Sequence, residues 1–115
     1  MAAVVALVPD LLFGSKVEGM LAAGGHEVTL VADPARALEL AGEADVLVVD
    51  LAGGQVDGPA RLAGGPPGAR TLGFFSHVEP EVREAALAAG FDQVVPRSRM
   101  NREGADLVSA LASGP

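Results

Sequence analysis

Four polar residues stand where predicted strands end, and their side chains suit phosphoryl chemistry: Asp10, Asp50, Ser76 and Arg97. Parallel strands of an open sheet bring their carboxyl ends to one edge, so we expect these groups to lie close together. Two carboxylates with water suit a hard divalent cation such as Mg²⁺. A hydroxyl and a guanidinium can hold phosphoryl oxygens beside it.

Each of these residues also has an ordinary structural interpretation. Asp10 and Asp50 can start turns, as aspartate often does after a strand. Ser76 can cap the helix expected to begin near Glu79. Arg97 can pair with a surface carboxylate, an interaction that contributes little to stability. The sequence leaves both interpretations open for all four positions.

The strands that would carry these residues are predicted from short apolar runs. Val46–Val49 is the clearest run, because four consecutive apolar residues, three of them β-branched, are typical of a strand buried on both faces. We expect this strand to lie centrally in the sheet and to end at Asp50. The full set of predicted strands covers residues 3–8, 27–31, 45–50, 71–75 and 91–95.

Helical spacing of apolar residues, preceded by capping residues, recurs between these runs. Helices are predicted over residues 11–23, 34–41, 82–89 and 102–112, with about two further turns around 59–63. Strands alternating with helices through short loops predict a parallel sheet covered on both faces. The expected fold class is therefore α/β, a three-layer α/β/α flavodoxin-like architecture in a single domain over residues 1–115.

Composition limits the partners and the chemistry. The 115-residue chain has a formal net charge of −7, and Lys16 is the single lysine among its eight basic residues. No basic stripe is present to neutralise phosphates, so a nucleic acid is not an expected partner. The absence of cysteine excludes disulfides and thiol chemistry, and no apolar run reaches membrane-spanning length. We expect a cytoplasmic protein without membrane contact.

Two segments have a recognisable pattern. Asp50–Gly58 reads Asp-Leu-Ala-Gly-Gly-Gln-Val-Asp-Gly, and Ala89–Asp92 reads Ala-Gly-Phe-Asp. The first resembles the Asp-Leu-x-x-Pro-x-x-Asp-Gly motif of receiver domains of bacterial response regulators, and the second is similar to the Ala-Gly-Ala-Asp before that family's fifth strand. The resemblance covers nearly the whole chain and implies a five-stranded sheet in the order 2-1-3-4-5.

The resemblance also implies a role for each site residue. Asp50 would accept a phosphoryl group from a histidine kinase, with Mg²⁺ held by Asp10 and Asp50. Ser76 would hydrogen-bond the phosphoryl group, and Arg97 would pair with it in place of the family's lysine. Receivers usually carry two adjacent acids where this chain has Asp10 alone, and a switching aromatic residue where it has Val94. A weaker metal site and a weaker switch are therefore expected.

Three functions follow from these observations. The first is a stand-alone receiver-like signalling domain that is gated by phosphorylation of Asp50, acts through contact with a histidine kinase, another signalling protein or a second copy, and is not an enzyme. The second is a pseudo-receiver, which binds a partner without being phosphorylated. The third is a small flavodoxin-like ligand-binding protein or enzyme. It is the least favoured, because the sequence supplies neither aromatic stacking partners nor a phosphate loop for a flavin.

Overall fold

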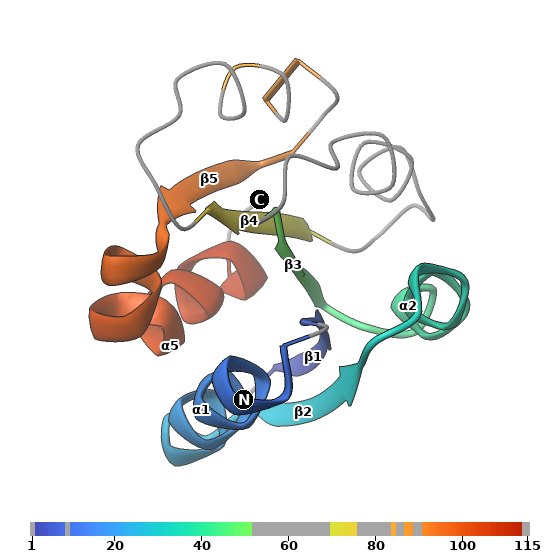
Figure 1. Ribbon diagram of the computed structural model, residues 1–115, viewed down its shortest axis with the longest axis horizontal. Coiled ribbons are helices and arrows are strands. Elements are labelled where there is room, and N and C mark those ends of the chain that lie inside the picture. Colours follow the sequence, from blue (N-terminus) through green and yellow to red (C-terminus); the bar gives the residue numbers. More distant parts are fainter. Residues whose placement is uncertain are drawn as a thin grey trace.

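Five parallel strands form the middle layer of the molecule (Figure 1). The structure, a computed structural model, describes residues 2–8, 10–51, 70–75, 84, 87–88 and 91–113. The strands are β1 (Ala3–Leu7), β2 (Glu27–Val31), β3 (Val46–Asp50), β4 (Arg70–Phe75) and β5 (Gln93–Pro96). They lie in the order β2-β1-β3-β4-β5, so the predicted strand order and α/β class are confirmed.

Helices cover both faces of this sheet. The described helices are α1 (Leu11–Ala23), α2 (Pro34–Ala41) and α5 (Arg97–Ser113). α1 and α5 lie together on one face, and α2 lies on the other, which gives the predicted three layers (Figure 1). The predicted turns around 59–63 and most of the predicted helix over 82–89 lie outside the described residues. In the described part of the chain, no helix has the length and apolar character needed to cross a membrane.

The central position predicted for β3 is confirmed. It pairs with β1 on one side and with β4 on the other. Val46–Val49 are buried, each with 1% or less of its surface exposed. Because successive side chains of a strand point to opposite faces, Val48 joins the core under α1 and α5, whereas Val49 joins the core under α2. Asp50, the last residue of β3, is half-buried at the carboxyl edge of the sheet.

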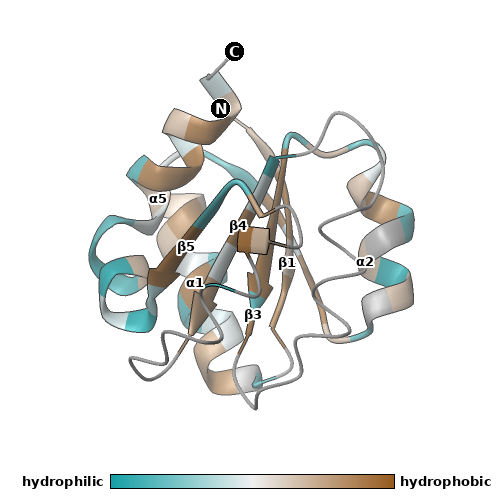
Figure 2. Cartoon of the chain, turned by 90° about the horizontal axis from the view of Figure 1, so that it is seen from above, coloured by the Kyte–Doolittle hydropathy of each residue, from teal (hydrophilic) through white to brown (hydrophobic). Residues whose placement is uncertain are grey.

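The apolar core fills both spaces between sheet and helices. Figure 2 shows hydrophobic residues along the strands, and hydrophilic residues mainly on the helices. Phe74 is the largest fully buried side chain and lies on the face that α1 and α5 cover. Burying a side chain of this kind stabilises the fold by roughly 1.5–3 kcal/mol. The packed layers therefore fix the strand ends at which the polar residues lie.

The structure corrects the predicted start of the last helix. α5 begins at Arg97 and not near residue 102, so β5 passes into the helix without a loop. The additional turn contains Met100, which is fully buried, and Gly104 in the predicted part of the helix is buried on the same face. These two residues extend the apolar stripe that continues through Leu107 and Val108. The prediction counted only the later part of the stripe and so placed the helix start too late.

Strand boundaries differ from the predictions by one or two residues. β1 ends at Leu7, and β4 starts one residue early, at Arg70. β5 covers Gln93–Pro96 in place of the predicted 91–95. Pro96 is tolerated as its last residue because β5 is an edge strand, and a proline there costs no ladder hydrogen bond on the open side.

α1 and α5 approach each other closely at two glycines. A Cβ added to Gly24 would lie 2.6 Å from the Cβ of Ala105, and one added to Gly104 would lie 2.6 Å from the Cε of Met20. No side chain fits between the helices at Gly24 without a shift. The two helices are therefore held at a fixed separation across this face of the sheet.

A buried histidine joins three elements at the amino edge of the sheet. His26 is 7% exposed, and its Nδ1 accepts a hydrogen bond from the Ala2 N–H at 3.2 Å. Nε2 therefore carries the proton, and it lies 3.1 Å from both the Ala105 carbonyl oxygen and the Ser109 hydroxyl. No role was predicted for His26 from the sequence, because the two glycines before it indicated a loop.

Candidate functional site

The carboxyl edge of the sheet brings together some of the residues predicted to form a site. Asp10 comes shortly after β1, Asp50 ends β3, and Arg97 directly follows β5. The strands are parallel and adjacent in the predicted order, so these positions share one edge. Ser76 follows β4 in the sequence and lies outside the described residues, so its predicted role stays a prediction.

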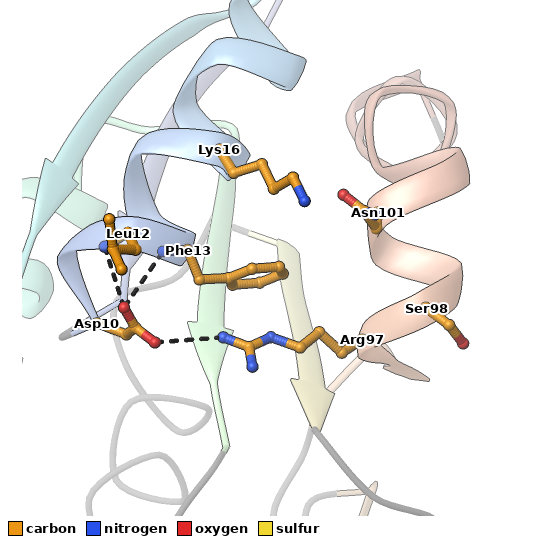
Figure 3. Close-up of a pocket in the computed structure, with 7 residues that line it drawn as sticks. All are labelled: Asp10, Leu12, Phe13, Lys16, Arg97, Ser98 and Asn101. Atoms are coloured by element: carbon orange, nitrogen blue, oxygen red, sulfur yellow. Dashed lines mark hydrogen bonds and ion pairs between the residues drawn. The ribbon is translucent and has the colours of Figure 1, made fainter.

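Asp10 has two partners, one for each carboxylate oxygen. Oδ1 accepts hydrogen bonds from the backbone N–H groups of Leu12 at 3.0 Å and Phe13 at 3.2 Å, which makes Asp10 the N-cap of α1. Oδ2 lies 3.6 Å from Nη2 of Arg97 (Figure 3). That distance is an ion pair and is too long for a direct hydrogen bond. Asp10 thus links the start of α1 to the start of α5.

Arg97 is held by an aromatic ring as well as by this ion pair. Its guanidinium carbon lies 3.6 Å from the centre of the Phe13 ring, the geometry of a cation–π contact. Phe13 in turn packs against Phe74 of the core, with ring centroids 5.3 Å apart. Nε of Arg97 is shielded from solvent and has no hydrogen-bond partner among the described residues. The side chain as a whole is 33% exposed, so Arg97 is half-buried against the protein.

A groove of about 520 Å³ lies between the first turns of α1 and α5, beside the Asp10–Arg97 pair (Figure 3). Its lining residues are Asp10, Leu12, Phe13, Lys16, Arg97, Ser98 and Asn101. Lys16 extends from α1 toward Asn101 on α5 (Figure 3). Leu12 is 88% exposed, an unusual position for a large apolar side chain. The groove therefore combines an exposed apolar residue with the chain's only lysine.

The part that Phe13 plays at this site was not predicted from the sequence. Its apolar spacing indicated the core-facing side of α1, and the ring does pack on Phe74. The second role, as the surface on which Arg97 stacks, depends on the early start of α5 and on the close packing of the two helices. Those features are not visible in the local pattern. The only available signal was a Phe three residues after Asp10.

The predicted metal site rests on Asp10 and Asp50. Among the residues that the structure describes, no group of three or more histidine, cysteine, aspartate or glutamate side chains is arranged to hold a metal ion. Mg²⁺ retains most of its water ligands and can bind through one or two carboxylates, so this finding does not test the site by itself. Mg²⁺ at Asp10 and Asp50 stays a prediction from the sequence.

The fold and the position of the acids define a class of protein. A five-stranded parallel sheet in the order 2-1-3-4-5, covered by helices on both faces, is the flavodoxin-like doubly wound class. Within that class the chain has the fold of response regulator receiver domains, so the resemblance found in the sequence is confirmed.

Three solved structures illustrate the likeness. The signal receiver domain of NarL from Mycobacterium tuberculosis is 27% identical, with a TM-score of 0.78 over 99% of this chain and 98% of that chain. A response regulator from Thermotoga maritima is 14% identical, with a TM-score of 0.81 over 97% and 98% of the two chains. CpaE from Burkholderia thailandensis, assigned to pilus assembly, is 17% identical, with a TM-score of 0.82 over 99% and 100%.

No family model matches the sequence, and no curated protein matches it. The structural likeness extends over the whole length of the chain, and it includes proteins assigned to response regulation and to pilus assembly. One fold can host many functions, so the function has to be argued from the site.

Proposed function

We propose that the chain is a receiver-like signalling domain that acts by contact with another protein and turns over no small substrate. Its support is the receiver fold over the full length of the chain, together with an acid at the end of the central strand. The expected partner is a histidine kinase or another signalling protein, or a second copy of the chain. A cytoplasmic location is part of the same proposal.

The proposal has two versions, which differ in what happens at Asp50. In the first, Asp50 accepts a phosphoryl group; the spacing from Asp50 to Asp57-Gly58 and the position of Asp50 at the carboxyl edge favour it. In the second, the chain is a pseudo-receiver and Asp50 is not phosphorylated. One observation favours the second version: both oxygens of Asp10 already have protein partners.

We favour the pseudo-receiver because of how phosphoryl transfer to a carboxylate is assisted. Charge that develops on the transferring group has to be stabilised at the site by cations or by hydrogen-bond donors. Asp10 is the acid that would help to hold a metal ion for this purpose, and it caps α1 and pairs with Arg97. Arg97, the cation expected to pair with the phosphoryl group, is stacked on Phe13.

Incubation with a small acyl phosphate and Mg²⁺, followed by intact-mass measurement, separates the two versions. Asp50→Asn is the matched control, because it keeps the size and polarity of the side chain and removes the acceptor. The pseudo-receiver predicts that neither protein gains the mass of a phosphoryl group. A gain by the wild-type protein that Asp50→Asn lacks would establish the phosphorylated version instead.

A separate observation would contradict signalling by contact in either version. A flavin or nucleotide that remains bound to the purified protein, detected by its absorbance and identified by mass spectrometry, would favour the ligand-binding alternative. We expect the purified chain to carry no such ligand.

A further inference from the structure

We infer that the guanidinium of Arg97 occupies the place beside Asp10 that a divalent cation takes in a metal-dependent receiver, so that Asp10 has a cationic partner without a metal. The first ground is the donor set. Oδ1 of Asp10 accepts from two backbone N–H groups, and Oδ2 faces Nη2 of Arg97 at 3.6 Å. A cation bound to Oδ2 would have to share this oxygen with the Arg97 guanidinium.

The second ground is that Arg97 cannot withdraw easily. Its backbone is fixed because β5 passes directly into α5 at this residue. Its guanidinium lies on the Phe13 ring, and Phe13 is itself packed on Phe74 in the core. Two thirds of the side chain are covered, and Nε is shielded from solvent. These contacts hold the positive charge of Arg97 at a fixed position beside Asp10.

The third ground is electrostatic. The guanidinium of Arg97 places a positive charge beside Asp10. A divalent cation that approached Oδ2 would be repelled by this charge at short range. A divalent cation therefore does not fit beside Asp10 while Arg97 is in place. Removal of Arg97 should leave an acid at the sheet edge that can accept a cation.

Paramagnetic broadening by Mn²⁺ tests this assignment directly. The probe is Mn²⁺ alone, titrated into ¹⁵N-labelled protein, and the signals to follow are the backbone amides of Leu12 and Phe13, which Asp10 caps. In the wild-type protein we expect these amides to broaden no earlier than those of Glu39 and Glu43 on the other face of the sheet, which report general attraction to an acidic protein. In Arg97→Gln we expect them to broaden at a Mn²⁺ concentration about tenfold lower.

Arg99→Gln is the matched control. It removes the same charge from the same helix, but Arg99 pairs with Glu103 and not with Asp10. We expect its Mn²⁺ profile to equal that of the wild-type protein. If Arg97→Gln does not fold, Arg97→Met removes the charge and keeps an unbranched side chain that can lie on Phe13.

Two results would overturn the assignment. One is selective broadening at Leu12 and Phe13 in the wild-type protein, a result that needs no variant to be folded. The other is equal behaviour of Arg97→Gln and Arg99→Gln. Either result would leave contact with a partner protein as the proposed function, because that proposal is tested separately, by the ligand content of the purified chain.

Discussion

The guanidinium carbon of Arg97 lies 3.6 Å from the centre of the Phe13 ring, so the first residue of α5 rests on the first turn of α1. The same ring is 5.3 Å from the ring of Phe74, a fully buried residue of β4. A charged residue at the sheet edge is thus connected to the core through one aromatic side chain.

Phe13→Leu tests that connection. Leucine keeps an apolar side chain but loses the cation–π contact, worth about 0.5–1 kcal/mol, and the aromatic pair with Phe74, worth about 0.5–1.5 kcal/mol. We expect a loss of roughly 1–2 kcal/mol in the free energy of unfolding, measured by urea denaturation. Leu12→Ala, one residue away and 88% exposed, should change it by less than about 0.5 kcal/mol. Equal losses in the two variants would exclude a special role for the ring.

Asp10 has two roles that substitutions can separate. Asparagine caps helices about as well as aspartate, so Asp10→Asn removes only the ion pair with Arg97. Because both side chains are partly exposed, that loss should cost less than about 1 kcal/mol. Asp10→Ala removes the cap as well and should cost a further 0.5–2 kcal/mol or so. Chemical denaturation of both variants gives the comparison, and an asparagine variant as unstable as the alanine variant would show that the cap contributes nothing.

Two glycines, one within α1 and one at its end, should respond in opposite ways to alanine. A Cβ on Gly19 would meet no atom within 4 Å, and the residue is exposed within the helix, so Gly19→Ala should stabilise the protein by about 0.5–1 kcal/mol. A Cβ on Gly24 would lie 2.6 Å from the Cβ of Ala105, so Gly24→Ala should force the helices apart and destabilise by about 1–3 kcal/mol. Thermal unfolding of the pair shows the signs. Stabilisation by both would mean that α5 is not held tightly against α1.

His26→Ala should destabilise the amino edge of the sheet. The change leaves the Ala2 N–H without its acceptor and the Ala105 carbonyl without one of its donors, for an expected loss of about 1–3 kcal/mol. Hydrogen exchange of the Ala2 amide should accelerate more than exchange within β3. His26→Asn, whose shorter side chain places an oxygen near the position of Nδ1, should recover part of the loss. No recovery would indicate that packing, and not the hydrogen bond to Ala2, is what His26 provides.

Most of the architecture could be predicted from the sequence because each element has a local signature. Four apolar residues in a row mark β3, and an apolar stripe ended by Gly24-Gly25 marks α1 with its correct bounds. The start of α5 was placed too late, because the burial of Met100 in the additional turn depends on the contact of this helix with the rest of the core. Local spacing carries no information about such a contact.

Two members of the described site, Asp10 and Arg97, were predicted from the sequence, but the contacts that support them were not. The strand-end rule placed Asp10 and Arg97 at one edge, and the structure joins them at 3.6 Å. That the pair would be supported by Phe13 depends on the packing of two helices far apart in the sequence. The burial of His26 has the same origin, because Ala105 and Ser109 reach it only when α5 is docked.

α5 is anchored at two places about 12 Å apart along its axis, at Arg97 near one edge of the sheet and at Ala105 near the other. Because the helix is held at both places, it can change its orientation only if one of these two contacts breaks. Reorientation of this helix would therefore be an all-or-none event, and the contact that gives way first, with Asp10 or with His26, would decide which end of the helix becomes available to a partner.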